Sequence, residues 1–154
     1  MGMPPDELAD LVFAASVHDV GKIAVPEHIL NKPGPLTEDE YRVVKTHVEV
    51  SGQILSVIPN GERLRLTVAH HHERFDGAGY PAGLRGEQIP LGARILGVAE
   101  AYVNMTVDRP YAATRSSEEA LAEMERLSGS QFDGLLVRIL MKQVKDLRPG
   151  WRGK

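Results

Sequence analysis

Apolar side chains that recur every three or four residues run through most of this 154-residue chain, whereas the alternating pattern of a half-buried strand is scarce. Breakers such as Pro59-Asn60-Gly61 divide the apolar stretches into segments of helical length. Each segment has one apolar stripe to bury against its neighbours. The sequence therefore predicts an all-α fold, a bundle of about five to seven helices.

Capping signals indicate where several of these helices begin. Thr37 with Glu40, and Ser116 with Glu119, have the spacing of a capping box, in which each partner satisfies a free backbone N–H of the first turn. Together with the prolines and the apolar periodicity, these signals predict helices over Pro5 to Asp19, Thr37 to Leu55 and Glu62 to Glu73, a helix from Pro90 onward, and a last helix capped by Asp133.

The overall composition argues against several classes of protein. The 18 basic and 21 acidic side chains leave a formal net charge of −3, which is not the electrostatic signature of a protein that binds nucleic acid or an anionic membrane. Without cysteine the chain has neither disulfides nor thiolate metal ligands, as is common in a reducing cytoplasm. No stretch has the composition of a leader or a membrane span. We expect a cytoplasmic protein with one domain over residues 1–144 and a frayed tail over residues 145–154.

The stretch from His71 to Pro81 combines metal-ligand side chains with a rigid turn. His71 and His72 close a predicted helix, and Asp76-Gly77-Ala78-Gly79-Tyr80-Pro81 follows at once. Two glycines permit positive φ angles and the proline stiffens the exit. This arrangement predicts a held loop beside a polar site.

Ionisable side chains also occur in several helical registers where apolar residues are expected. They are His18, Asp19, His47, His71, His72 and Glu100. A buried carboxylate needs a compensating partner, and a bound metal is the simplest one when neutral imidazoles surround it. A histidine and carboxylate set without sulfur suits Fe, Mn or Co, with Zn as an alternative. Asp19 has two oxygens and is able to bridge two metals about 3.5–4 Å apart, as in sites that cleave phosphate esters.

Each of these residues has an ordinary explanation when it is taken alone. A His-Asp pair is commonly a surface pair, and a single buried histidine or helical glutamate is commonly satisfied by a neighbour. The metal interpretation rests on their joint occurrence in registers that face one core. Lys22 and Arg109 are suited to hold phosphate oxygens, but solvated surface charge is the commoner explanation of either one taken alone. His28 and His70 are not predicted to be ligands.

The sequence resembles the HD-GYP family, a branch of the HD-domain metal-dependent phosphohydrolases. The resemblance extends over roughly residues 8–140, and its motifs are His18-Asp19-Val20-Gly21-Lys22, His47, His71-His72-Glu73 and Gly79-Tyr80-Pro81. It implies an HD-domain helical bundle that binds two or three divalent transition metals, Fe or Mn before Zn, Co or Ni. It also implies hydrolysis of the bacterial messenger cyclic di-GMP, by a metal-bridging hydroxide, to a linear dinucleotide or to GMP.

The resemblance further implies a role for each matching residue. His18 and Asp19 are metal ligands with Asp19 bridging, His47, His71 and His72 complete the second metal, and Glu100 lies where the family has an aspartate ligand. The resemblance also implies that Asp19 and Lys22 are the catalytic residues. Substrate phosphates are contacted by Lys22 and Arg109, and the loop Gly79-Tyr80-Pro81 faces substrate or a partner such as a GGDEF-type cyclase.

Some positions depart from the family pattern. Only 17 residues precede His18 and none is histidine, although the family has a metal-binding histidine on an upstream helix. Val103 and Ala112 stand where an acid and a base are common. Three interpretations follow: a phosphodiesterase for cyclic di-GMP whose upstream helix lies outside this chain, a degenerate module that binds nucleotide or a partner without turnover, and a phosphohydrolase for another nucleotide.

Overall fold

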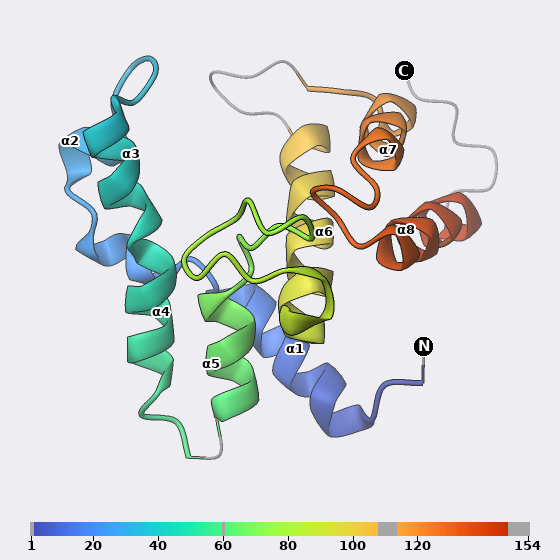
Figure 1. Ribbon diagram of the computed structural model, residues 1–154, viewed down its shortest axis with the longest axis horizontal. Coiled ribbons are helices and arrows are strands. Elements are labelled where there is room, and N and C mark those ends of the chain that lie inside the picture. Colours follow the sequence, from blue (N-terminus) through green and yellow to red (C-terminus); the bar gives the residue numbers. More distant parts are fainter. Residues whose placement is uncertain (1, 60, 108–113, 148–154) are drawn as a thin grey trace.

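The fold is described by a computed structural model that places residues 2–59, 61–107 and 114–147 (Figure 1). Within these ranges the chain forms helices and loops and no strand, so the predicted all-α fold is confirmed. The helical elements are, in order, α1 (Pro5–Val17), the 3₁₀ turn η1 (Val20–Ala24), α2 (Glu27–Leu30), α3 (Glu38–Lys45), α4 (His47–Leu55), α5 (Glu62–Ala69), the 3₁₀ turn η2 (Gly86–Gln88), α6 (Leu91–Thr106), α7 (Ser117–Arg126) and α8 (Gly134–Leu147).

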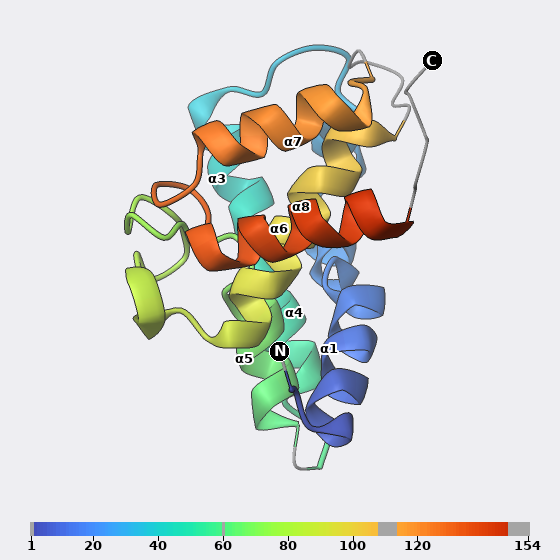
Figure 2. The ribbon, with the colours of Figure 1, turned by 90° about the vertical axis from the view of Figure 1, so that its right-hand side faces the viewer.

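The helices pack around two apolar clusters. The first joins α1, α4 and α5 through Ala14, Leu55, Leu64 and Val68. The second joins α6, α7, α8 and the turn before α8 through Val98, Met124, Phe132, Leu136 and Val137. Helix α6 contacts α1 and α5 on one side and α7 and α8 on the other, so it connects the two clusters (Figures 1 and 2).

Two predicted helices are shorter than the apolar periodicity suggests. The predicted helix from Thr37 to Leu55 is divided at Thr46 into α3 and α4, because both the backbone N–H and the hydroxyl of Thr46 donate to the carbonyl of Val43. The predicted helix from Glu62 to Glu73 ends at Ala69, so the double histidine lies in the turn beyond α5. Both breaks lie directly beside histidines of the predicted site.

Both predicted capping boxes are present. Thr37 Oγ1 accepts from the backbone N–H of Glu40 at 3.2 Å, and the Glu40 carboxylate accepts from the backbone N–H of Thr37 at 2.7 Å. Ser116 and Glu119 repeat the arrangement at the start of α7. Asp133 accepts from the backbone N–H of Leu135 at 2.9 Å, as expected of the residue that precedes α8.

We expect Thr37→Ala to lower the free energy of unfolding by about 1 kcal/mol, because an N-terminal N–H of α3 loses its side-chain acceptor. Urea denaturation followed by circular dichroism measures the loss. The matched variant Thr37→Ser keeps a hydroxyl and should remain within a few tenths of a kcal/mol of the wild type. Equal losses in both variants would show that the hydroxyl does not stabilise the helix start.

Helix α8 continues to Leu147, beyond the predicted end of the domain at residue 144. No helix among the described residues combines the length and the hydropathy that a membrane crossing requires. Arg109, predicted to contact phosphate, and Ala112 lie outside the described residues.

Candidate metal centre

Three of the predicted histidines are placed by the ends of three helices. His18 follows α1, His47 follows α3 and His71 follows α5. In each case Nδ1 bonds to the carbonyl three residues earlier, Ala15 at 2.8 Å, Val44 at 2.6 Å and Val68 at 2.6 Å. These carbonyls belong to the last turn of a helix, where they lack the partners that a longer helix supplies.

This placement determines the tautomer of the three imidazoles. A carbonyl oxygen only accepts hydrogen bonds, so Nδ1 must carry the proton in each ring. Nε2 is then left with a lone pair, which is the state of a metal ligand. The same contact explains why α5 is short: at Val68 an imidazole N–H occupies the carbonyl that a continuing helix would bond to a backbone N–H.

Ser51 links the backbone of His18 to α4, the helix that begins at His47. Its hydroxyl donates to the carbonyl of His18 at 2.9 Å and accepts from the backbone N–H of Gly21 at 2.8 Å. A Cβ on Gly21 would lie 2.1 Å from the carbonyl oxygen of His47, so only glycine permits this approach. Sequence reasoning missed Ser51. The available signal was a small polar residue one helical turn after His47, within an apolar register.

The side chains meet in two overlapping groups whose potential ligand atoms lie within 4.8 Å of one another. One group is His47, His71 and His72, and the other is His18, Asp19 and His71. His71 belongs to both. Asp19 directs Oδ2 toward Nε2 of His18 and Oδ1 toward Nε2 of His47, each at 3.5 Å. A carboxylate whose two oxygens face different imidazoles has the orientation required of a bridging ligand.

Three buried polar atoms of this cluster have no hydrogen-bond partner among the described residues. They are Asp19 Oδ1, His47 Nε2 and His71 Nε2. Leaving such an atom unsatisfied costs about 1–3 kcal/mol, so a cluster of three calls for a common partner. Since all three atoms are lone-pair donors that point at one another, the partner that fits is a cation. The donor set of nitrogen and oxygen without sulfur suits a divalent transition metal.

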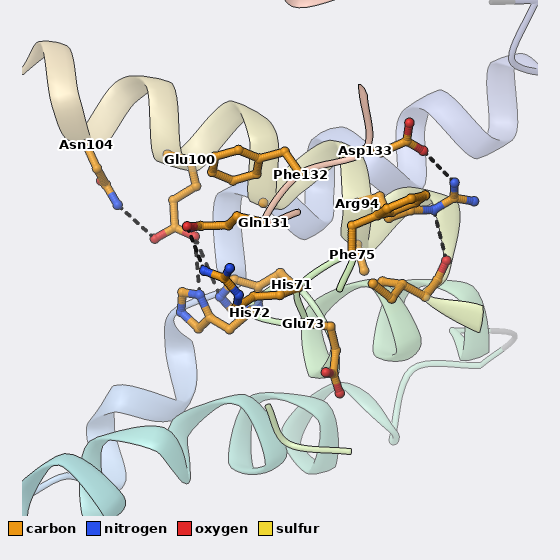
Figure 3. A pocket seen from close by; sticks show the side chains of 15 residues that line it. His71, His72, Glu73, Phe75, Arg94, Glu100, Asn104, Gln131, Phe132 and Asp133 are labelled. Atoms are coloured by element: carbon orange, nitrogen blue, oxygen red, sulfur yellow. Dashed lines mark hydrogen bonds and ion pairs between the residues drawn. The ribbon is translucent and has the colours of Figure 1, made fainter. Parts of the chain in front are cut away.

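Glu100 approaches the same imidazoles from α6 (Figure 3). Its Oε2 lies 3.9 Å from Nε2 of His71 and 4.0 Å from Nδ1 of His72. Asn104, one turn further along α6, donates to the other oxygen, Oε1, at 3.2 Å. Glu100 therefore directs Oε2 toward the cluster, while Asn104 holds Oε1 in place. Asn104 was missed by sequence reasoning, although its spacing of four residues from Glu100 was visible.

The electrostatic environment keeps the ligands in their metal-binding forms. Burial, with the repulsion of neighbouring histidines, lowers the pKa of His71 to about 3 and that of His72 to about 4. Burial opposes ionisation of Asp19, but the hydrogen bond and charge of Lys22 outweigh it and hold the pKa of this carboxyl below its usual value. At neutral pH these two imidazoles are neutral and the carboxylate is charged.

We expect the metal-free protein to lose stability as the pH falls. Unfolded histidine binds a proton near pH 6.5, whereas His71 and His72 remain neutral in the folded state until pH 3–4. The unfolded state therefore takes up more protons below pH 6.5, and stability falls with pH through that window. Asp19, with its lowered pKa, acts in the same direction at lower pH. Between pH 7 and pH 5 the loss should be on the order of 2–4 kcal/mol.

Urea midpoints of the metal-free protein, measured at half-unit pH intervals, test this expectation. His28 is exposed, so His28→Asn is a matched control that should leave the profile unchanged. A flat profile between pH 7 and pH 5 would mean that the buried histidines are accessible to protons in the folded state.

Lys22 and Tyr80, both predicted to face substrate, border the cluster. Lys22 Nζ lies 2.6 Å from Asp19 Oδ2, and its side chain is 41% exposed, so it is able to reach a ligand. The ring of Tyr80 lies against that of His72 with the centroids 5.1 Å apart. The backbone N–H of Tyr80 also donates to the carbonyl of His72 at 3.3 Å.

The glycine-rich loop, Asp76 to Pro81, is held against the cluster by contacts of its backbone. Gly77 uses the freedom that glycine has and adopts φ of +81°, whereas Gly79 does not adopt a positive φ. Gly79 is required for a different reason: a Cβ there would lie 2.2 Å from the backbone nitrogen of Arg74. The buried Glu73 carboxylate accepts from the backbone N–H groups of Ala82 at 2.7 Å and Leu84 at 3.1 Å, which fixes the far side of the loop.

A cavity of about 250 Å³ adjoins Glu100 and the double histidine (Figure 3). Its wall includes two paired arginines. Arg74 donates to Gln131 and Asp76, and Arg94 donates to Asp133 and to the carbonyl of Ile89. His28 and His70 join neither ligand group, and Nδ1 of His70 lies 3.6 Å from Oε1 of Glu73.

Comparison with known proteins identifies the family of this chain. Residues 1–136 match the HD domain family. The chain is 38% identical over 157 residues to a cyclic di-GMP phosphodiesterase of Thermotoga maritima, covering 99% of this chain and 42% of the relative. It is 41% identical over 144 residues to the cyclic di-GMP phosphodiesterase response regulator RpfG of Xanthomonas campestris, covering 92% of this chain and 38% of the relative.

A solved structure supports the fold. The crystal structure of a cyclic GMP-AMP specific phosphodiesterase of Vibrio cholerae, V-cGAP3, superimposes with a TM-score of 0.67 at 20% identity, covering 94% of this chain and 40% of that one. The chain thus spans less than half the length of the relatives it matches. It belongs to the HD-domain family, and its His18-Asp19, His71-His72 and Gly79-Tyr80-Pro81 motifs, together with its relatives, assign it to the HD-GYP branch.

Proposed function

We propose that this chain is a metal-dependent phosphodiesterase that hydrolyses cyclic di-GMP in bacterial second-messenger signalling. The observation that carries the proposal is the pair of overlapping ligand groups that share His71, with Asp19 facing both. Two relatives named as cyclic di-GMP phosphodiesterases, at 38% and 41% identity, support the choice of substrate.

The residues that would hold two divalent metals are those of the two groups, with Glu100 as a further ligand. Fe or Mn suits their nitrogen and oxygen donors, with Zn, Co and Ni as alternatives. When bound, such metals lower the pKa of water and neutralise the charge of a phosphodiester.

The side chains around the ligands have distinct tasks. Lys22 keeps Asp19 ionised and presents an ammonium group to a phosphate oxygen. Arg109 is proposed to add a second cation to the same phosphate. The Tyr80 ring covers His72 and limits the access of water to that side of the centre.

Elemental analysis of anaerobically purified protein, followed by cyclic di-GMP hydrolysis assays, tests the proposal. We expect about two Fe or Mn per chain and conversion to a linear dinucleotide or GMP. Asp19→Asn keeps the shape of the side chain and should remove both the metal and the activity, whereas the exposed His28→Asn should keep them. Protein without bound transition metal would contradict the proposal. Tight binding of cyclic di-GMP without turnover, with Mn and with Fe, would instead favour a degenerate binding module.

A further inference from the structure

A row of side chains leads outward from the metal centre. It begins at His72, whose ring lies 5.1 Å from the ring of Tyr80, centroid to centroid. Lys45 Nζ lies 5.3 Å from the Tyr80 centroid and 4.4 Å from that of Tyr41. Tyr41 and Lys45 are on α3, and Tyr80 is on the glycine-rich loop. The row therefore joins two elements that flank the site.

Two features of this row are unusual for a purely structural cluster. Tyr41 is a large aromatic residue, yet it is 42% exposed. Lys45 forms no ion pair with a carboxylate among residues 2–59, 61–107 and 114–147, whereas Lys22 pairs with Asp19 and Lys32 with Glu40. A cation over aromatic faces is held in place without its charge being neutralised. Two aromatic rings and an ammonium group that has no carboxylate partner among the described residues therefore lie together beside the metal centre.

Cyclic dinucleotides have matching chemistry. They contain two phosphodiesters and two bases, and the metal centre can engage only the phosphodiester being cleaved. The other phosphodiester needs a cation, and a base that extends beyond the centre needs an aromatic surface, because every base has a π-face that stacks on such a ring. Tyr41, Lys45 and Tyr80 offer both.

We propose that Tyr41, Lys45 and Tyr80 form a subsite for the second nucleotide of the substrate. A purine base stacks on the Tyr41 ring, and Lys45 contacts the phosphodiester that is not cleaved. The inference rests on the proposed function and deepens it, since it assigns recognition of the distal nucleotide to α3. Tyr41 and Lys45 are binding residues in this assignment and take no part in bond cleavage.

Steady-state kinetics of Tyr41→Leu and Lys45→Met with cyclic di-GMP test the subsite. We expect KM to rise about 10-fold in each variant, with kcat within about twofold and metal content unchanged. Tyr41→Phe keeps the aromatic ring, so its KM should equal that of the wild type. Lys142→Met removes an exposed lysine of α8 and serves as the charge-matched control. Unchanged KM in Tyr41→Leu and Lys45→Met would overturn the subsite, as would an equal rise in Tyr41→Phe or Lys142→Met.

Assays with a second substrate show whether a negative result contradicts the proposed subsite or the proposed function. Methyl p-nitrophenyl phosphate has one phosphodiester and no base, so its hydrolysis should be equal in the wild type, Tyr41→Leu and Lys45→Met. A similar loss with this substrate would show that the variants damage the centre, which overturns the subsite while the function stands.

If the wild type hydrolyses neither substrate, the proposed function fails and binding alone decides the subsite. GMP is then titrated into metal-free protein and followed by the NMR signals of the tyrosine rings. Binding that weakens about 10-fold in Tyr41→Leu supports the subsite. Equal binding in the variant, or no binding to the wild type, overturns it.

Discussion

Replacing His71 by alanine is expected to abolish metal binding at both ligand groups and to reduce phosphodiester hydrolysis by at least about 10³-fold. His71 is the residue that the two groups share, and its Nε2 has no hydrogen-bond partner among the described residues. A metal that acts as a Lewis acid contributes several kcal/mol to the transition state, and each 1.36 kcal/mol is a factor of ten in rate. Inductively coupled plasma mass spectrometry and cyclic di-GMP turnover measure the two effects.

The neighbouring histidine provides the matched control. His72 belongs to one ligand group only, so His72→Ala should retain more metal than His71→Ala. Because His71 is buried, urea denaturation must show that the variant is still folded. A folded His71→Ala protein with a full metal complement would contradict the shared-ligand arrangement.

Gly21→Ala should be among the most destabilising single substitutions in the chain, with a loss of about 3 kcal/mol in the free energy of unfolding. The added Cβ would lie 2.1 Å from the carbonyl oxygen of His47 and 2.6 Å from the backbone nitrogen of Ser51. Both atoms belong to the backbone of α4, which cannot rotate away as a side chain would. Relief requires α4 to move from η1, and that movement separates His47 from Asp19.

Metal affinity should therefore fall together with stability in Gly21→Ala, by more than about tenfold. Gly2→Ala is the matched control, because no atom lies within 4 Å of a Cβ at that position and its φ is not positive. Thermal denaturation and competitive metal titration of both variants test the prediction. Wild-type stability in Gly21→Ala would show that α4 and η1 do not pack as closely as described.

The parts of the fold that were predicted correctly depend on local interactions. The two capping boxes involve residues three apart in the chain, so the sequence displays both partners side by side. The helix from Pro90 onward and the last helix after Asp133 follow from periodicity and from residues that favour helix starts. The end of a helix depends on whether side chains or backbone N–H groups bond to its last carbonyls. The apolar periodicity carries no information about that competition.

The imidazole contacts at Val44 and Val68 show this limit. Each histidine takes a terminal helix carbonyl, and the helix is interrupted beside it, at Thr46, which keeps helical backbone angles, and at His70, which does not. The apolar pattern continues through both breaks, so a helix was predicted where a helix end places a ligand. Gly79 is a similar case, since its close contact with Arg74 involves residues that meet only when the loop folds back.

Periodicity, local capping and side-chain chemistry were enough to predict the fold class, the starts of several helices and the types of residue available for a metal centre. Which residues meet follows from the tertiary structure. It made His71 common to both ligand groups, set Ser51 between His18 and Gly21, and brought Lys45 between Tyr41 and Tyr80. These contacts join residues up to 53 positions apart in the chain, as for His18 and His71, and helix packing, which depends on the whole core, sets the distances between them.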